Sequence, residues 1–224
     1  MLNVDLDLWA EDLRQLGREF FALVRQLIGE DAPEAARIFG FRRPEAMYLL
    51  FRMSKEQLDT ALSVSGLPFG VGDEHALAAD LRNLDVAKPK YSLPAQMAAA
   101  AESLQMAYFE RVRTVARENP GEAASLFGFS DLHRIVAPLA SLSLNGLRKV
   151  SRLNHALSIN SNVGIEMLHS LISTGASHER IAIAGWTAYT SCGQADLSLT
   201  GKFDLSVDCK GTSDGQLQLS ENAI

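Results

Sequence analysis

An internal repeat limits what this chain can fold into more than any other feature of its sequence. A heptapeptide that ends in Phe39-Gly40-Phe41 returns 88 positions later, where it ends in Phe127-Gly128-Phe129. Aligned without a gap, positions 20–41 and 108–129 share ten of twenty-two residues. The alignment continues beyond Phe41 once one residue is inserted in the second copy, so that Met53 matches Leu142. The chain is therefore a tandem duplication of one unit.

The residue pattern within each unit predicts helices. Apolar residues recur every three or four positions over residues 5–28 and again over 95–117, which is typical of one long amphipathic helix in each unit. We expect Gly29 to end the first of these helices. We expect the apolar sides of these two helices to form a core or a pairing surface. The candidate residues for this surface are Trp9, Leu13, Leu16, Phe20 and Tyr108.

Capping signals divide the rest of each unit into shorter helices. Asp31 followed by Pro33 and Glu34 starts a helix that ends at Gly40, and Pro44 opens the next one. Ser54 begins a capping box for a fourth helix. In the second unit Pro138 falls where the third helix should be copied, so we expect that helix to be shortened or kinked.

These elements predict an all-α fold of two tandem helical units that pair as a pseudo-dimer within one chain. We place the first unit at 1–84, a linker at 85–94, the second unit at 95–175 and a tail at 176–224. In the tail, Leu197, Leu199, Phe203, Leu205 and Val207 fit the period of a strand, so the tail is partly β or disordered.

The composition excludes several classes of protein. Apolar residues make up 47% of the 224 positions, as in ordinary globular proteins. No apolar run approaches the ~20 residues of a membrane helix, and the N-terminus lacks the basic start of a secretory signal, so we expect a cytoplasmic protein without membrane contact. A net charge of −6 argues against DNA binding through bulk electrostatics.

The corner between the second and third helices has the spacing of a helix-turn-helix. Ala36 lies four positions before Gly40, which suits two short helices that cross tightly over a glycine turn. If this corner contacts DNA, Arg42 and Arg43 would bind phosphates or base edges. The alternative is a plain helical corner without a role in binding.

The second unit carries a basic region in an otherwise acidic chain. No acidic residue occurs between Asp131 and Glu166, whereas the region holds several cations. The candidate DNA-binding residues there are Arg134, Arg148, Lys149 and Arg152. The last three have helical spacing and could face phosphate or an acidic partner. A solvated helix face is the alternative.

The sequence gives no catalytic or metal-binding signature. Its five histidines form no His-x-x-x-His pair, and no phosphate-binding Gly-x-x-x-x-Gly-Lys motif occurs. Cys192 and Cys209 are too few for a cysteine zinc site, and in a reducing compartment we expect no disulfide between them. We therefore expect no enzyme activity, no cofactor and no metal.

The first unit resembles FlhD, the helical subunit of the bacterial FlhD–FlhC transcriptional activator. The resemblance rests on these elements: Gln26-Leu27-Ile28-x-x-Asp31, Ala36-x-x-x-Gly40, Glu45-Ala46 and Gln57-Leu58-x-x-Ala61, followed by Leu67, Phe69 and Asp73-Glu74-His75. It spans about 13–84. The second unit keeps Ala124-x-x-x-Gly128 and is assigned by its similarity to the first.

The resemblance implies a helical pseudo-dimer or homo-oligomer that binds a zinc-containing FlhC-like partner, which supplies much of the DNA contact. The family's inter-chain cysteine has no counterpart near Leu67-Pro68-Phe69. The first interpretation is thus a transcriptional regulator that acts as a scaffold and reaches DNA through the complex. The alternative is an interaction module, such as an anti-activator, that binds the same partner without touching DNA.

Overall fold

The computed structural model describes residues 6–41, 44–64, 67–159, 169–170 and 173–175. Within these ranges the protein is mostly helical, and the only strands there are two segments of two residues each. This confirms the predicted all-α class. The expected tail, 176–224, lies outside the described residues.

The first unit contains four helices in the predicted order. They are α1 (Leu6–Glu30), α2 (Ala32–Phe39), α3 (Pro44–Arg52) and α4 (Lys55–Val64). Our prediction that Gly29 ends the first helix was wrong. The Asp31 N–H donates to the carbonyl of Leu27 at 2.7 Å, so the helical hydrogen bonding continues past Gly29 to Glu30.

The chain then leaves the first unit through a short strand and a helix before it enters the second. The remaining elements are β1 (Phe69–Gly70), α5 (Glu74–Arg82), α6 (Ala95–Glu118), α7 (Pro120–Phe127), the π-helical turn η1 (Leu132–Val136), α8 (Ala137–Ser141), α9 (Leu144–Ser151) and β2 (Ser158–Ile159). The order long helix, capped short helix, corner and further helix therefore occurs twice.

Helices α2 and α7 begin and end in the same way. The side chain of Asp31 accepts a hydrogen bond from the Glu34 N–H at 3.0 Å, and Asn119 accepts one from the Glu122 N–H at 3.1 Å. Both helices end at a left-handed glycine, Gly40 with φ 72° and the corresponding glycine of α7 with φ 73°. The repeated sequence thus encodes a repeated local structure.

The residue inserted in the second unit is accommodated as a π-helical turn. In η1 the Ala137 N–H donates to the carbonyl of Leu132, five residues earlier, which is the wider ring that one extra residue creates in a helix. The short helix α8 follows with Pro138 in its first turn and ends at Ser141. Together η1 and α8 cover 132–141, so the copy of α3 is not shortened, which was one of the two outcomes we expected from Pro138. Its first half is instead wound as a π turn.

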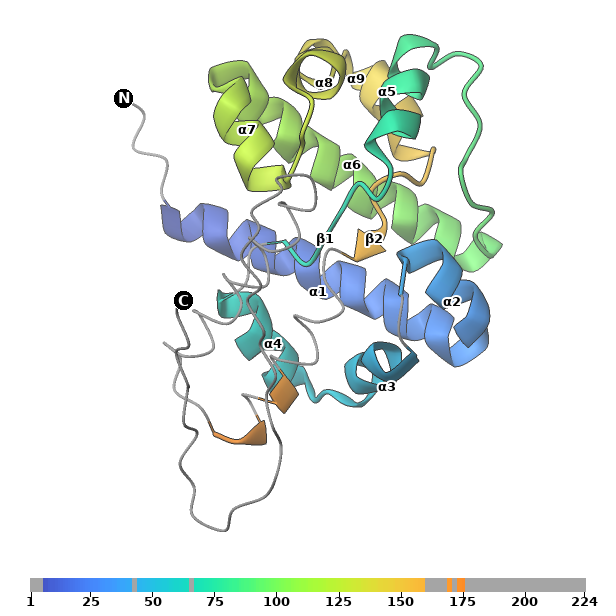
Figure 1. Cartoon of the computed structure of the whole chain (residues 1–224), viewed down its shortest axis with the longest axis vertical. Coiled ribbons are helices and arrows are strands. Elements are labelled where there is room, and N and C mark those ends of the chain that lie inside the picture. The colour runs from blue at the N-terminus through green and yellow to red at the C-terminus, as the bar shows by residue number, and fades with distance from the viewer. Residues whose placement is uncertain (1–5, 42–43, 65–66, 160–168, 171–172, 176–224) are drawn as a thin grey trace, which may run out of the picture.

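The two long helices run antiparallel and hold the units together. Arg111 of α6 donates to Asp12 near the start of α1 at 2.8 Å, and Gln96 near the start of α6 donates to Glu30 at 2.7 Å. Figure 1 shows α3 and α4 on one side of α1, with α5, α7, α8 and α9 on the other. The units therefore form one body around the α1–α6 pair.

The aromatic core repeats with the sequence. The rings of Phe20 and Phe39 meet edge to face at 5.6 Å and 88°, and those of Tyr108 and Phe127 meet at 5.6 Å and 83°. Each pair is 88 positions from the other. Phe69 joins them, with its ring 4.5 Å from Phe20 and 5.5 Å from Tyr108. The two units consequently share one core.

Strands β1 and β2 add a second connection, which the sequence analysis did not predict. They pair antiparallel, with Phe69 opposite Ile159 and Gly70 opposite Ser158 (Figure 1). Strand β1 follows α4 and strand β2 follows α9, the corresponding helices of the two repeats. This pairing places Phe69 at the centre of the interface between the units.

Helix α5 precedes the second unit in the chain but packs on it in space. The carboxylate of Glu74 accepts hydrogen bonds from the backbone N–H of Ser130, at 3.0 Å, and from its hydroxyl, at 2.7 Å. Helix α5 also contacts η1. The end of the first unit thus braces the corner of the second.

Candidate functional site

Three of the basic side chains predicted to bind DNA, Arg148, Lys149 and Arg152, lie in α9 or directly after it, and two of these have acidic partners. Lys149 pairs with Asp85, and the Arg152 guanidinium lies 2.8 Å from Glu102. Arg148 is exposed, and no ion pair involves it within the described ranges. The basic region of the sequence is therefore largely neutralised in the fold.

The acids that neutralise this region come from distant parts of the chain. Asp85 belongs to the linker after α5, and Glu102 belongs to α6. Arg134, at η1, lies 3.5 Å from Asp131, which precedes the same turn. The segment 132–165 contains no acidic residue, so its sequence alone could not reveal these pairs. Asp85 lies 64 positions from Lys149, and Glu102 lies 50 positions from Arg152.

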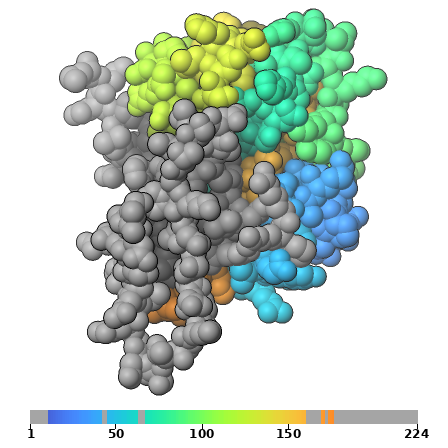
Figure 2. All heavy atoms as spheres, viewed as in Figure 1, coloured from blue at the N-terminus to red at the C-terminus, as the bar shows by residue number. Residues whose placement is uncertain are grey.

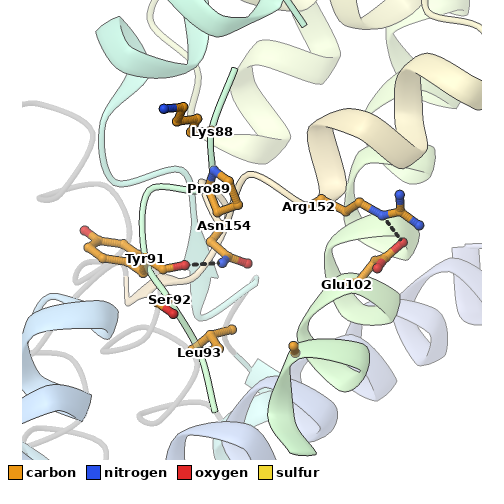
Figure 3. A pocket seen from close by; sticks show the side chains of 9 residues that line it. Lys88, Pro89, Tyr91, Ser92, Leu93, Glu102, Arg152 and Asn154 are labelled. Atoms are coloured by element: carbon orange, nitrogen blue, oxygen red, sulfur yellow. Dashed lines mark hydrogen bonds and ion pairs between the residues drawn. The ribbon is translucent and has the colours of Figure 1, made fainter. Parts of the chain in front are cut away.

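A groove of about 490 Å³ lies between the linker and α6, beside Arg152 (Figure 3). Its lining combines cations, one carboxylate and apolar groups: Lys88, Pro89, Tyr91, Ser92, Leu93, Ala98, Glu102, Arg152 and Asn154. The Arg152–Glu102 pair spans one of its walls. The sequence analysis did not identify this groove, because its walls come from three separate segments.

A buried polar network supports the floor of the groove. The Gln105 amide donates to Asn154 at 3.0 Å and accepts from the Ala156 N–H at 3.1 Å, while Asn154 donates to the carbonyl of Tyr91 at 2.7 Å. Asn154 has φ 61°, a left-handed conformation that asparagine tolerates better than most residues. These bonds fix the linker to the second unit.

Next to this network, the buried His155 pairs with the partly exposed Asp80. The histidine is 4% exposed, and its Nε2 lies 2.8 Å from the Asp80 carboxylate on α5. Burial lowers the pKa of His155 below its ordinary value of 6.5, although the hydrogen bond and charge of Asp80 oppose this. Lys90 lowers the pKa further and Asp73 raises it. The pair ties α5 to the second unit.

The predicted helix-turn-helix corner is formed by α2 and α3 around Gly40. Arg42 and Arg43, the two arginines assigned to DNA there, lie outside the described residues. The outer side of α3 carries Tyr48 and Phe51, which are 58% and 49% exposed. The sequence analysis did not single out these aromatics, and they are the large exposed apolar side chains of α3.

The residues predicted to form the core or pairing surface mostly do so. Leu16, Phe20 and Tyr108 are buried at the centre of the molecule, and Leu13 is partly buried against the same core. Trp9 lies in α1, but its side chain is outside the described part of the structure. The pairing surface is internal, between the two units.

The described residues provide no ready metal centre or membrane helix. Among them, no group of three or more His, Cys, Asp or Glu side chains is arranged to hold a metal ion. None of the helices in the same residues combines the length and apolar character that crossing a bilayer demands.

The sequence matches no family model, no curated protein and no solved structure in the comparisons with known proteins. The fold itself defines the class of protein: two fused helical units around a shared core, with a neutralised basic surface on the second unit and an aromatic surface on the first.

Proposed function

We propose that this protein is a transcriptional regulator of the FlhD-like class, a cytoplasmic helical scaffold that reaches DNA in complex with a zinc-containing FlhC-like partner. One observation carries the proposal: Phe69 contacts both Phe20 and Tyr108, so a single chain supplies the paired core that two identical subunits would otherwise form. The resemblance of the first unit to FlhD supports the same assignment.

Direct contact with DNA falls to Arg148 in this proposal. Lys149 and Arg152 are already paired with carboxylates, and a cation that must leave such a partner contributes less to phosphate binding. Arg148 is exposed and needs no such exchange. The chain therefore contributes little of the phosphate contact, and the partner supplies most of it.

The test is the salt dependence of promoter binding by the purified complex. Each phosphate contact contributes about 0.9 to the slope of log K against log salt concentration. We expect Arg148→Ala to reduce the slope by about 1. Lys149→Ala and Arg152→Ala should each change the slope only slightly. Arg37→Ala, which removes an exposed arginine in the first unit, is the control and should leave the slope unchanged.

The second candidate is an anti-activator that binds the same partner without touching DNA. The pairing of Lys149 with Asp85 and of Arg152 with Glu102 favours it, because these pairs remove charge from the surface assigned to phosphate. Two results together would favour this candidate over the first. The salt-dependence slope would be unchanged in Arg148→Ala, Lys149→Ala and Arg152→Ala, and the partner would release the promoter when it binds this chain.

A further inference from the structure

The outer side of α3 differs from most of the described surface in chemistry. Tyr48 and Phe51 lie one helical turn apart and are about half exposed. On the opposite side of the helix, Ala46, Met47 and Leu50 are buried in the core. Helix α3 is therefore anchored along one side and presents two aromatic rings on the other.

Two exposed cations follow these rings closely in the chain. Arg52 is exposed in the last turn of α3, and Lys55 is exposed at the first position of α4. Within the described ranges neither forms an ion pair, in contrast to Lys149 and Arg152 on α9. We define the α3 face as Tyr48, Phe51, Arg52 and Lys55. In Figure 2 atoms in the light blue of α3 are visible at the lower right of the molecule.

The second unit does not reproduce this surface. Counted back from the match of Met53 with Leu142, the equivalents of Tyr48 and Phe51 are Ala137 and Ala140. The equivalents of Arg52 and Lys55 are Ser141 and Leu144. A homodimer of one unit would carry this face twice, whereas the fused chain carries it once.

We infer that the α3 face is the docking surface for one copy of a partner protein, whose apolar contact area is bordered by carboxylates. Half-exposed tyrosine and phenylalanine beside arginine is the composition of an interface centre. The unpaired cations complement acidic groups on the partner and disfavour a basic one. The inference rests on the proposed function. It adds two statements: the partner binds at the α3 face, and each chain binds one partner.

The first experiment places p-benzoylphenylalanine at position 48 of the full-length protein in its native host. Irradiation should cross-link it to one protein other than this chain. The matched control carries the same group at position 137, the equivalent site in the second unit, and should give no such product. Cross-links only to a second copy of the chain, only to its own tail, only to nucleic acid or to nothing would overturn the inference.

The second experiment measures the affinity of the purified cross-linked protein for the full-length chain by calorimetry. Loss of an interface centre typically weakens binding by about 30-fold or more, so we expect at least that from Tyr48→Ala with Phe51→Ala. The same titration should give a stoichiometry of one. Leu144→Ala, which truncates an exposed apolar residue at the position equivalent to Lys55, is the control and should bind as the wild type does.

Charge reversal tests the acidic border of the partner. Arg52→Glu with Lys55→Glu should weaken binding strongly at low salt and less at high salt. Unchanged affinity in both double variants would overturn the α3 face but leave the proposed function standing, because a partner would still bind elsewhere. Failure of the wild-type chain to bind any protein would overturn both.

Discussion

Phe20 and Tyr108 occupy equivalent positions in the two repeats and both contact the ring of Phe69, at centroid distances of 4.5 Å and 5.5 Å. All three side chains are at most 1% exposed. Phe69 itself sits on β1, opposite Ile159 of β2. The junction between the repeats is thus a packed core, and its stability depends on one residue near the end of the first unit.

Phe69→Ala should destabilise the whole protein. Truncation of a buried phenylalanine costs about 3–5 kcal/mol, because apolar contacts are lost and a cavity remains. Chemical denaturation of the purified protein measures this loss. Phe51→Ala removes the same side chain from an exposed site and should change the free energy of unfolding by no more than about 0.5 kcal/mol. Equal effects of the two variants would contradict the shared core.

The two helix-ending glycines provide a matched pair of tests. Alanine at either Gly40 or Gly128 must adopt a left-handed conformation, which costs about 1–2 kcal/mol. At Gly40 the added Cβ would also lie 3.0 Å from the hydroxyl of Ser158, whereas at Gly128 it would meet nothing within 4 Å. Thermal unfolding should therefore show Gly40→Ala as the more destabilised variant. The opposite order would mean that β2 does not approach the first corner.

The buried His155, paired with Asp80, predicts how stability depends on pH. Because the folded-state pKa of His155 is lowered, the unfolded chain binds the proton more readily. This contribution to stability is therefore complete above about pH 6.5, the ordinary histidine pKa, and declines as the pH falls below it.

Unfolding curves of His155→Gln, recorded between neutral and mildly acidic pH, measure this contribution. The variant should lose part of the decline in stability on acidification, whereas His75→Gln, at an exposed site on α5, should keep it. The same acid dependence in His155→Gln and in the wild type would show that another group is responsible.

Gln105 tests the buried polar network under the groove. In Gln105→Leu the Ala156 N–H and the Asn154 side chain each lose a buried partner, which costs about 1–3 kcal/mol for each group left unsatisfied. Gln96→Leu on the same helix removes only an exposed bond to Glu30 and should have little effect. Denaturation midpoints compare the two. A neutral Gln105→Leu would mean that water replaces the amide.

The sequence predicted those features that short segments encode. The cap at Asp31 and the turn at Gly40 each depend on a few neighbouring residues, so they could be located without the fold. The structure shows the same cap and turn at Asn119 and Gly128 of the repeat. The repeat then predicted a paired arrangement of the units. Gly29 was misjudged because glycine lowers helix propensity but does not prevent a final turn.

The features that the sequence did not reveal depend on residues that are far apart in the chain. The β1–β2 pair has two residues per strand, too few to show an alternating pattern. The carboxylates that pair with Lys149 and Arg152 lie 64 and 50 positions away, and Asp80 lies 75 positions from His155. The packing of α5, the linker and α6 around the end of the second unit brings these groups together.

The central claim is that both repeats share one cooperative core, and hydrogen exchange of Phe20→Ala tests it most directly. The variant removes a ring from α1, and mass spectrometry follows the protection of backbone amides in α1 and in α6 across a denaturant series. A shared core predicts that protection falls at the same denaturant concentration in both helices and shifts by the same amount. Loss of protection in α1 while α6 keeps the wild-type midpoint would contradict it.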